Sequence, residues 1–112
     1  MLSLSSYGIQ RTDHAGEYVI ASVANGLALD ATIDDELRRH PVMWTPHAEA
    51  HQRWRLHPTE DGSAFVIQSV LTGHVLDVPE GSERHDRPVL WERHGGIIQQ
   101  FLVVSPAGGL LR

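Results

Sequence analysis

The sequence of 112 residues contains no cysteine and no lysine. The lack of cysteine excludes disulfide bonds and thiolate chemistry, so packing must provide the stability. The nine basic residues are all arginines, scattered from Arg11 to Arg112, and fourteen acidic residues bring the formal net charge to -5. Because the scattered arginines form no basic stripe, the sequence argues against nucleic-acid binding.

Long apolar runs are lacking as well. Hydrophobic residues make up 41% of the chain and charged residues 21%, which is typical of one folded domain and atypical of a disordered or membrane-spanning chain. The first six residues have neither the positive flank nor the apolar run of a signal peptide. We therefore expect no membrane insertion, and we leave the localisation open because a leader can be removed from a protein.

The sequence repeats itself at an offset of 47 residues. Residues 12–54 align without a gap with residues 59–101, and fourteen of the 43 aligned pairs are identical. Chance would give about two or three identities, so the match indicates a duplicated structural unit. The identical pairs include Asp30 with Asp77, Trp44 with Trp91, His47 with His94, and Gln52 with Gln99.

Each unit is predicted to form four short strands joined by turns. Residues 17–23 and 64–70 are rich in β-branched and aromatic residues, and Asn25-Gly26 or Thr72-Gly73 then provides a tight-turn signal, which predicts a hairpin. The other predicted strands are residues 27–30, 41–44 and 52–56 in the first unit and 74–77, 88–91 and 99–103 in the second. With one short helical turn possible at 33–39, the pattern predicts an all-β fold.

The order of three motifs in the two units resembles the ricin-B-type lectin family. A Gly-Leu-x-Leu-Asp segment ends at Asp30, a Pro-Val-x-Trp strand ends at Trp44, and Gln52-Arg53-Trp54 matches the Gln-x-Trp signature of that family. Gln99-Gln100-Phe101 is a conservative variant of the same signature. The resemblance implies a β-trefoil fold for a single domain over residues 1–112.

A trefoil has three units, and three units of 47 residues beginning at Tyr7 would need about 141 residues. We therefore expect repeat one at about 7–53, repeat two at about 54–100, and only the first strand of a third repeat within 101–112. A barrel that lacks strands exposes unpaired backbone and apolar surface. We accordingly expect a homo-oligomer that completes the barrel, or a truncated chain.

The resemblance implies non-catalytic carbohydrate binding, with galactose-type sugars favoured. An indole ring stacks on the C–H face of the sugar while a carboxylate accepts hydrogen bonds from its hydroxyls. The candidate site residues are Asp30, Trp44, His47, His51 and Gln52 in repeat one, and Asp77, Trp91, His94 and Gln99 in repeat two. Repeat one is the better candidate, because Ile98 replaces in repeat two the polar residue that precedes the motif glutamine.

Structural roles for the same residues remain open. Gln52 and Gln99 are expected to bond loop backbone, the two aspartates can stabilise turns, and the two tryptophans can pack or stack. The core is expected to contain Trp54, Phe101, Tyr18 and Phe65. The alternative function is therefore a degenerate trefoil that binds another protein, as an inhibitor or an assembly module, and the chain can also be one domain of a larger glycan-active or toxin protein.

Metal and catalytic sites are not expected. His47 and His51 have the spacing of metal ligands, but the sequence shows no third ligand beside them and Ile98 replaces His51 in repeat two. No nucleophile elbow or comparable motif frames any of the eight histidines. The sequence thus predicts a protein without a cofactor that is not an enzyme.

Overall fold

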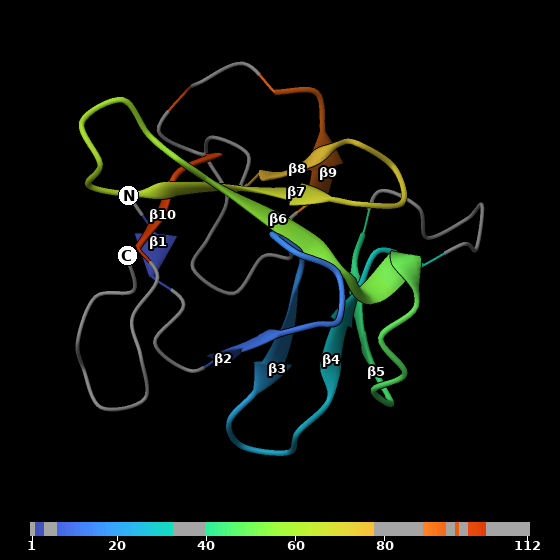
Figure 1. Ribbon diagram of the computed structural model, residues 1–112. Coiled ribbons are helices and arrows are strands. Elements are labelled where there is room, and N and C mark those ends of the chain that lie inside the picture. The colour runs from blue at the N-terminus through green and yellow to red at the C-terminus, as the bar shows by residue number, and fades with distance from the viewer. Residues whose placement is uncertain are drawn as a thin grey trace.

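The structure, a computed structural model, describes residues 2–3, 7–32, 40–77, 89–93, 96 and 99–102 (Figure 1). These residues form short strands and the 3-10 turn η1 (Ala50–Gln52), and Gln99 also has 3-10 conformation. No helix among them has the length and apolar character needed to cross a membrane. The helical turn considered for residues 33–39 lies outside the described residues.

The strands reproduce the duplication of the sequence. Repeat one contains β2 (Tyr7–Arg11), β3 (Tyr18–Ser22), β4 (Ala28–Asp30) and β5 (Val42–Trp44). Repeat two contains β6 (Trp54–Pro58), β7 (Phe65–Ser69), β8 (Val75–Asp77) and β9 (Val89–Trp91). Each strand of repeat two begins and ends 47 residues after its counterpart, so the predicted all-β fold with two repeats is confirmed.

Strand pairing repeats with the same register. In the antiparallel pair of β4 and β5, Leu29 lies opposite Met43, and in the pair of β8 and β9, Leu76 lies opposite Leu90. Between repeats, β3 pairs with β6, and the last described strand, β10 (Phe101–Leu102), pairs with β7 in the same way. The short strand β1 (Leu2–Ser3) pairs in parallel with β10. The first strand of the predicted third repeat is therefore present.

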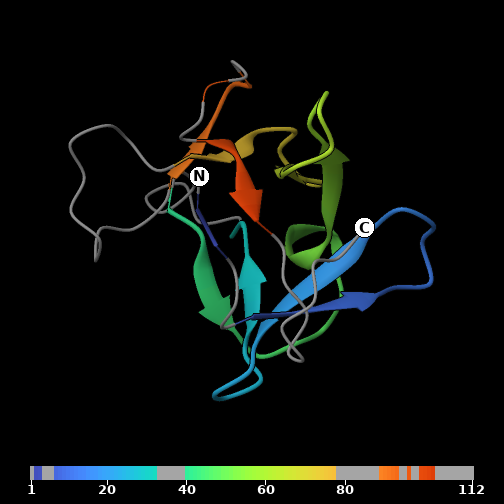
Figure 2. The same cartoon turned by 90° about the vertical axis from the view of Figure 1, so that its left-hand side faces the viewer.

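The two repeats occupy different ends of the molecule. Strands β2 to β5 gather at the lower end in both views, and β7 to β9 gather at the upper end (Figures 1 and 2). Strand β6 joins them, because it pairs with β3 on one side and with β7 on the other.

Glycines allow the hairpin turns that the sequence predicts. Gly26 and Gly73 have positive φ angles of 74° and 76°, a conformation that costs glycine little. Val23, predicted to end a strand, lies instead in the turn after β3 with 61% of its surface exposed. The strand ends earlier because Ser22 already pairs through its N–H with the carbonyl of Leu27, which closes the hairpin.

The core consists of apolar side chains that alternate along the strands. Its buried members are Ile20, Leu29, Ala31, Trp54, Ile67, Leu76, Leu90 and Phe101. The indole of Trp54 is fully buried, and its Nε1–H donates to the carbonyl of Leu29 at 3.0 Å. Trp54 and Phe101 thus lie in the core as expected, whereas Tyr18 and Phe65 are only half-buried.

The turn between β6 and β7 contains a carboxylate with an unusual acidity. Asp61 Oδ1 accepts hydrogen bonds from the Ser63 N–H at 3.0 Å, the Ser63 hydroxyl at 2.8 Å and the Thr59 hydroxyl at 2.8 Å. These donors, the Ser63 backbone first, lower the pKa of Asp61 from its ordinary 3.8 to about 2.

Acid should remove the contribution of this turn to stability. A lowered carboxylate pKa stabilises the fold above the unfolded value of 3.8, and this contribution disappears as the pH falls from 3.8 through about 2. We expect Asp61→Asn to lower Tm at pH 6 and to lower it less at pH 2, as measured by circular dichroism. An equal difference in Tm at both pH values would contradict this assignment.

Candidate functional site

The candidate site is built on the hairpin of β4 and β5. Asp30 lies opposite Val42 and Ala28 lies opposite Trp44, so these four side chains share one face of the hairpin. Leu29 occupies the other face and belongs to the core. Asp30 and Trp44 are therefore diagonal neighbours across the two strands, a relation within reach of an aromatic ring.

A buried amide holds Asp30 in place. Gln52 is fully buried, and its Nε2 donates to Asp30 Oδ2 at 3.0 Å and to the carbonyl of Thr45 at 3.0 Å. Its Oε1 accepts the backbone N–H of His47 at 2.8 Å and of Ala48 at 3.3 Å. One side chain thus fixes the loop after β5 against the aspartate.

The prediction that Gln52 begins a strand is wrong. Gln52 ends the 3-10 turn η1 (Ala50–Gln52), and β6 begins at Trp54. The tight turn directs the amide inward toward Asp30, which an extended strand would not do. Because no surface of Gln52 is exposed, its role is to position the site rather than to contact a ligand.

Repeat two contains the same amide and carboxylate pair. Gln99 is fully buried and donates to Asp77 Oδ2 at 2.9 Å and to the carbonyl of Glu92 at 2.8 Å. His94, also predicted as a site residue in this repeat, lies outside the described residues. The shared skeleton of both sites is therefore a glutamine, an aspartate and a loop carbonyl.

Asp30 also accepts a hydrogen bond from the backbone that follows its strand. Its Oδ1 accepts the N–H of Thr32 at 2.7 Å, which stabilises the turn that follows β4. Asp30 is 5% exposed and Asp77 is 4% exposed. Asp30 thus fulfils the turn-stabilising role considered from the sequence, while its Oδ2 faces the polar groups of the loop.

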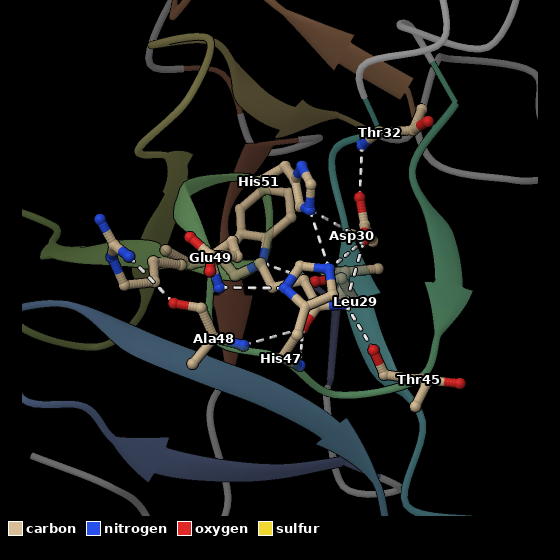
Figure 3. A network of polar contacts seen from close by, with 11 residues as sticks. Leu29, Asp30, Thr32, Thr45, His47, Ala48, Glu49 and His51 are labelled. Carbon is tan, nitrogen blue, oxygen red and sulfur yellow. Dashed lines mark hydrogen bonds and ion pairs between the residues drawn. The ribbon is translucent and has the colours of Figure 1, made fainter.

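Two histidines approach Asp30 from the loop and from η1 (Figure 3). His47 Nε2 lies 3.7 Å and His51 Nε2 lies 3.8 Å from Asp30 Oδ2, and the two Nε2 atoms are 2.8 Å apart. The expectation that this pair has no third ligand-type partner is therefore wrong. No sequence motif indicates this partner, because Asp30 lies 17 residues before His47 and only the fold brings the two side chains close.

The hydrogen bonds of His47 indicate which nitrogen of its neutral ring carries the hydrogen. Its Nδ1 accepts the N–H of Glu49 at 3.0 Å, so the neutral imidazole carries its hydrogen on Nε2. That hydrogen can be donated to His51 Nε2 at 2.8 Å. The site therefore offers a carboxylate acceptor and an imidazole donor side by side.

The two tryptophans of the predicted sites lie at the surface. Trp44 is 61% exposed and Trp91 is 44% exposed, and neither belongs to the core cluster. Exposure of a large apolar side chain next to a fixed polar group is a feature of binding surfaces. The packing role that the sequence left open for these two residues is therefore not one of core packing.

An ion pair between residues far apart in the sequence, for which no local motif gives a signal, supports the loop of His47. Arg53 Nε donates to Glu17 Oε1 at 2.8 Å, and Arg53 Nη1 donates to the carbonyl of Ala48 at 2.9 Å. The hydrogen bond from Arg53 is the main cause that lowers the pKa of Glu17, with Arg55 contributing. Repeat two has no counterpart, because Gln100 and Ala64 take the places of Arg53 and Glu17.

Comparison with known proteins gives a family and a fold. A family model for the ricin-type beta-trefoil lectin domain-like family matches residues 6–92, well over half of the chain. None of the curated protein sequences matches the chain. Solved structures match well enough to compare the fold.

Three of these structures illustrate the match. The designed threefold-symmetric protein ThreeFoil has a TM-score of 0.66 and 22% identity over 84% of this chain and 67% of its own. An exo-beta-1,3-galactanase from Clostridium thermocellum has a TM-score of 0.71 and 23% identity over 94% of this chain and 21% of its own. A Polyporus squamosus lectin bound to a human-type influenza-binding epitope has a TM-score of 0.64 and 18% identity over 84% of this chain and 33% of its own. The chain spans a third or less of the two natural proteins, and at these identities the likeness concerns the fold alone.

The central role of Gln52 predicts a large cost for its removal. Gln52→Ala leaves Asp30 Oδ2 and three loop backbone groups without their partner, so we expect a loss of about 2–4 kcal/mol in the free energy of unfolding. The exposed Gln10 provides the matched control, for which alanine should change stability by less than about 0.5 kcal/mol. Denaturant titration measures both, and equal stability of the two variants would contradict the role of Gln52.

Proposed function

Because the chain belongs to the ricin-type β-trefoil lectin domain-like family, we propose that it binds carbohydrate and catalyses no reaction. The binding site we propose is that of repeat one, with Asp30 and Trp44 at its centre. Asp77 and Trp91 form the corresponding weaker site of repeat two. Galactose-type sugars are the favoured ligands, by the resemblance to this family.

One observation carries the proposal, namely an exposed indole beside a fixed carboxylate on the same hairpin face. A sugar presents one face of C–H groups and a rim of hydroxyls, and the two side chains match these two parts. Trp44 is 61% exposed and so is free to stack. Asp30 is held by Gln52 and Thr32, so little ordering of the carboxylate is needed when a hydroxyl binds.

The histidines complete the polar side of the site. His47 carries hydrogen on Nε2, and both rings lie within 4 Å of Asp30 Oδ2. A sugar hydroxyl placed between them can donate to the carboxylate and accept from an imidazole at the same time. Repeat two has Ile98 at the position of His51, which is the reason that we propose the weaker site there.

A site of this shape binds weakly on its own. A shallow surface with one stacking ring and one carboxylate corresponds to a Kd of roughly millimolar to high micromolar. Simultaneous occupancy of several linked sites raises the overall affinity without any new contact. We therefore propose that the chain acts as a homo-oligomer, which light scattering at micromolar concentration tests directly.

A protein-binding module is the second candidate function. Val23 is 61% exposed in the turn between β3 and β4, and Leu71 is 41% exposed in the turn between β7 and β8. Together with Trp44 and Trp91 they provide apolar contact surface of the kind found in protein interfaces. This function becomes the leading one if the folded oligomer binds no glycan.

The stacking role of Trp44 predicts separate effects on binding and stability. Trp44→Ala should abolish binding on a glycan array at repeat one and change the free energy of unfolding by less than about 0.5 kcal/mol, because the ring is exposed. Trp91→Ala is the matched variant and should retain binding at repeat one. Unchanged glycan binding by Trp44→Ala, or its failure to fold, would contradict the proposal.

A further inference from the structure

Three potential metal ligands from three parts of the chain meet at one point. Asp30 ends β4, His47 lies in the loop after β5, and His51 lies in η1 (Figure 3). Their ligand atoms, one from each residue, all lie within 4.8 Å of one another. We propose that these three residues bind a divalent transition-metal ion, with zinc as the representative ion. This inference goes beyond glycan binding and does not depend on it.

The spacing of the three atoms fits the size of the ion. The triangle formed by Asp30 Oδ2 and the two histidine Nε2 atoms has sides of 3.7, 3.8 and 2.8 Å. A point at about 2.0 Å from all three corners follows from these sides, and zinc binds nitrogen and carboxylate oxygen at about 2.0–2.2 Å. Small shifts of the two rings are enough to bring the ion into contact with all three atoms.

The type of ligand also agrees with zinc. Two imidazoles and a carboxylate are the three-ligand set of open zinc sites, in which a water or another ligand takes the fourth position. Imidazole also binds copper and nickel, whereas magnesium and calcium prefer oxygen ligands. The side chain of His47 is 33% exposed and that of His51 is 23% exposed, so an ion can enter from solvent.

The surroundings hold the ligands in position before an ion binds. Asp30 accepts the N–H groups of Thr32 and Gln52, and Gln52 also fixes the backbone of His47. Such second contacts orient metal ligands and preserve affinity. Coordination through His47 Nε2 moves the ring hydrogen to Nδ1, so one exposed hydrogen bond, from the N–H of Glu49, is given up.

The second repeat supplies an internal comparison. Asp77 and Gln99 reproduce the carboxylate and its support, but Ile98 replaces His51 and removes one of the three ligands. The site is therefore specific to repeat one. We expect one zinc ion for each chain rather than two.

The test is a titration of the purified, untagged full chain with zinc chloride by isothermal calorimetry. We expect one zinc ion for each chain in the wild type. His47→Ala and His51→Asn should each weaken binding by at least about a hundredfold, since loss of a ligand costs more than the 10–100-fold of a supporting contact. His14→Ala, which removes an exposed histidine in another turn, should leave zinc binding unchanged.

One further variant keeps the metal and glycan proposals separate. Trp44 is not one of the three proposed ligands, so Trp44→Ala should lose sugar binding at repeat one and retain zinc binding. In nuclear magnetic resonance spectra of the wild type, zinc should also shift the imidazole signals of His47 and His51, a test that requires no variant. An unchanged zinc titration in both histidine variants, zinc-induced shifts only at other histidines, or no zinc binding by the wild type would overturn the proposal.

Discussion

The hydrogen bond from a buried glutamine amide to an aspartate carboxylate is the interaction on which each repeat depends. Gln52 and Gln99 are fully buried, and each joins the end of one strand to the loop after the next. A buried amide without partners is costly, so the pairing fixes one arrangement of hairpin and loop. The positions of Asp30 and of the loop histidine follow from this pairing.

The two repeats share this skeleton and differ around it. Strand bounds, registers and the turns at Gly26 and Gly73 agree at an offset of 47 residues, because the same apolar and turn-forming residues recur. The differences concern the polar side chains of the site, where His51 faces Asp30 but its counterpart is Ile98. Arg53 and Glu17 likewise support only the loop of repeat one. The two repeats thus have the same scaffold, and the site of repeat one has the more varied polar side chains.

Local patterns predicted the hairpin turns and the approximate positions of most strands, but they assigned Val23 and Gln52 to strands that do not contain them. Alternating apolar residues and glycine turns determine the hairpins, and the repeat predicts which residues correspond. The cluster of Asp30 with His47 and His51 could not be predicted, because it depends on how the 3-10 turn places Gln52 and on contacts between distant residues. Exposure of Trp44 was equally undecided, since a strand pattern does not show which face is covered.

The most direct test of glycan binding at repeat one is a nuclear magnetic resonance titration of the labelled chain with a galactoside. We predict saturable shifts of the Trp44 indole N–H and of the backbone at Asp30 and His51, with the core Trp54 indole unchanged. Saturation at about millimolar sugar would agree with one shallow site. Shifts confined to other surfaces, or none at about 10 mM galactoside, would contradict it.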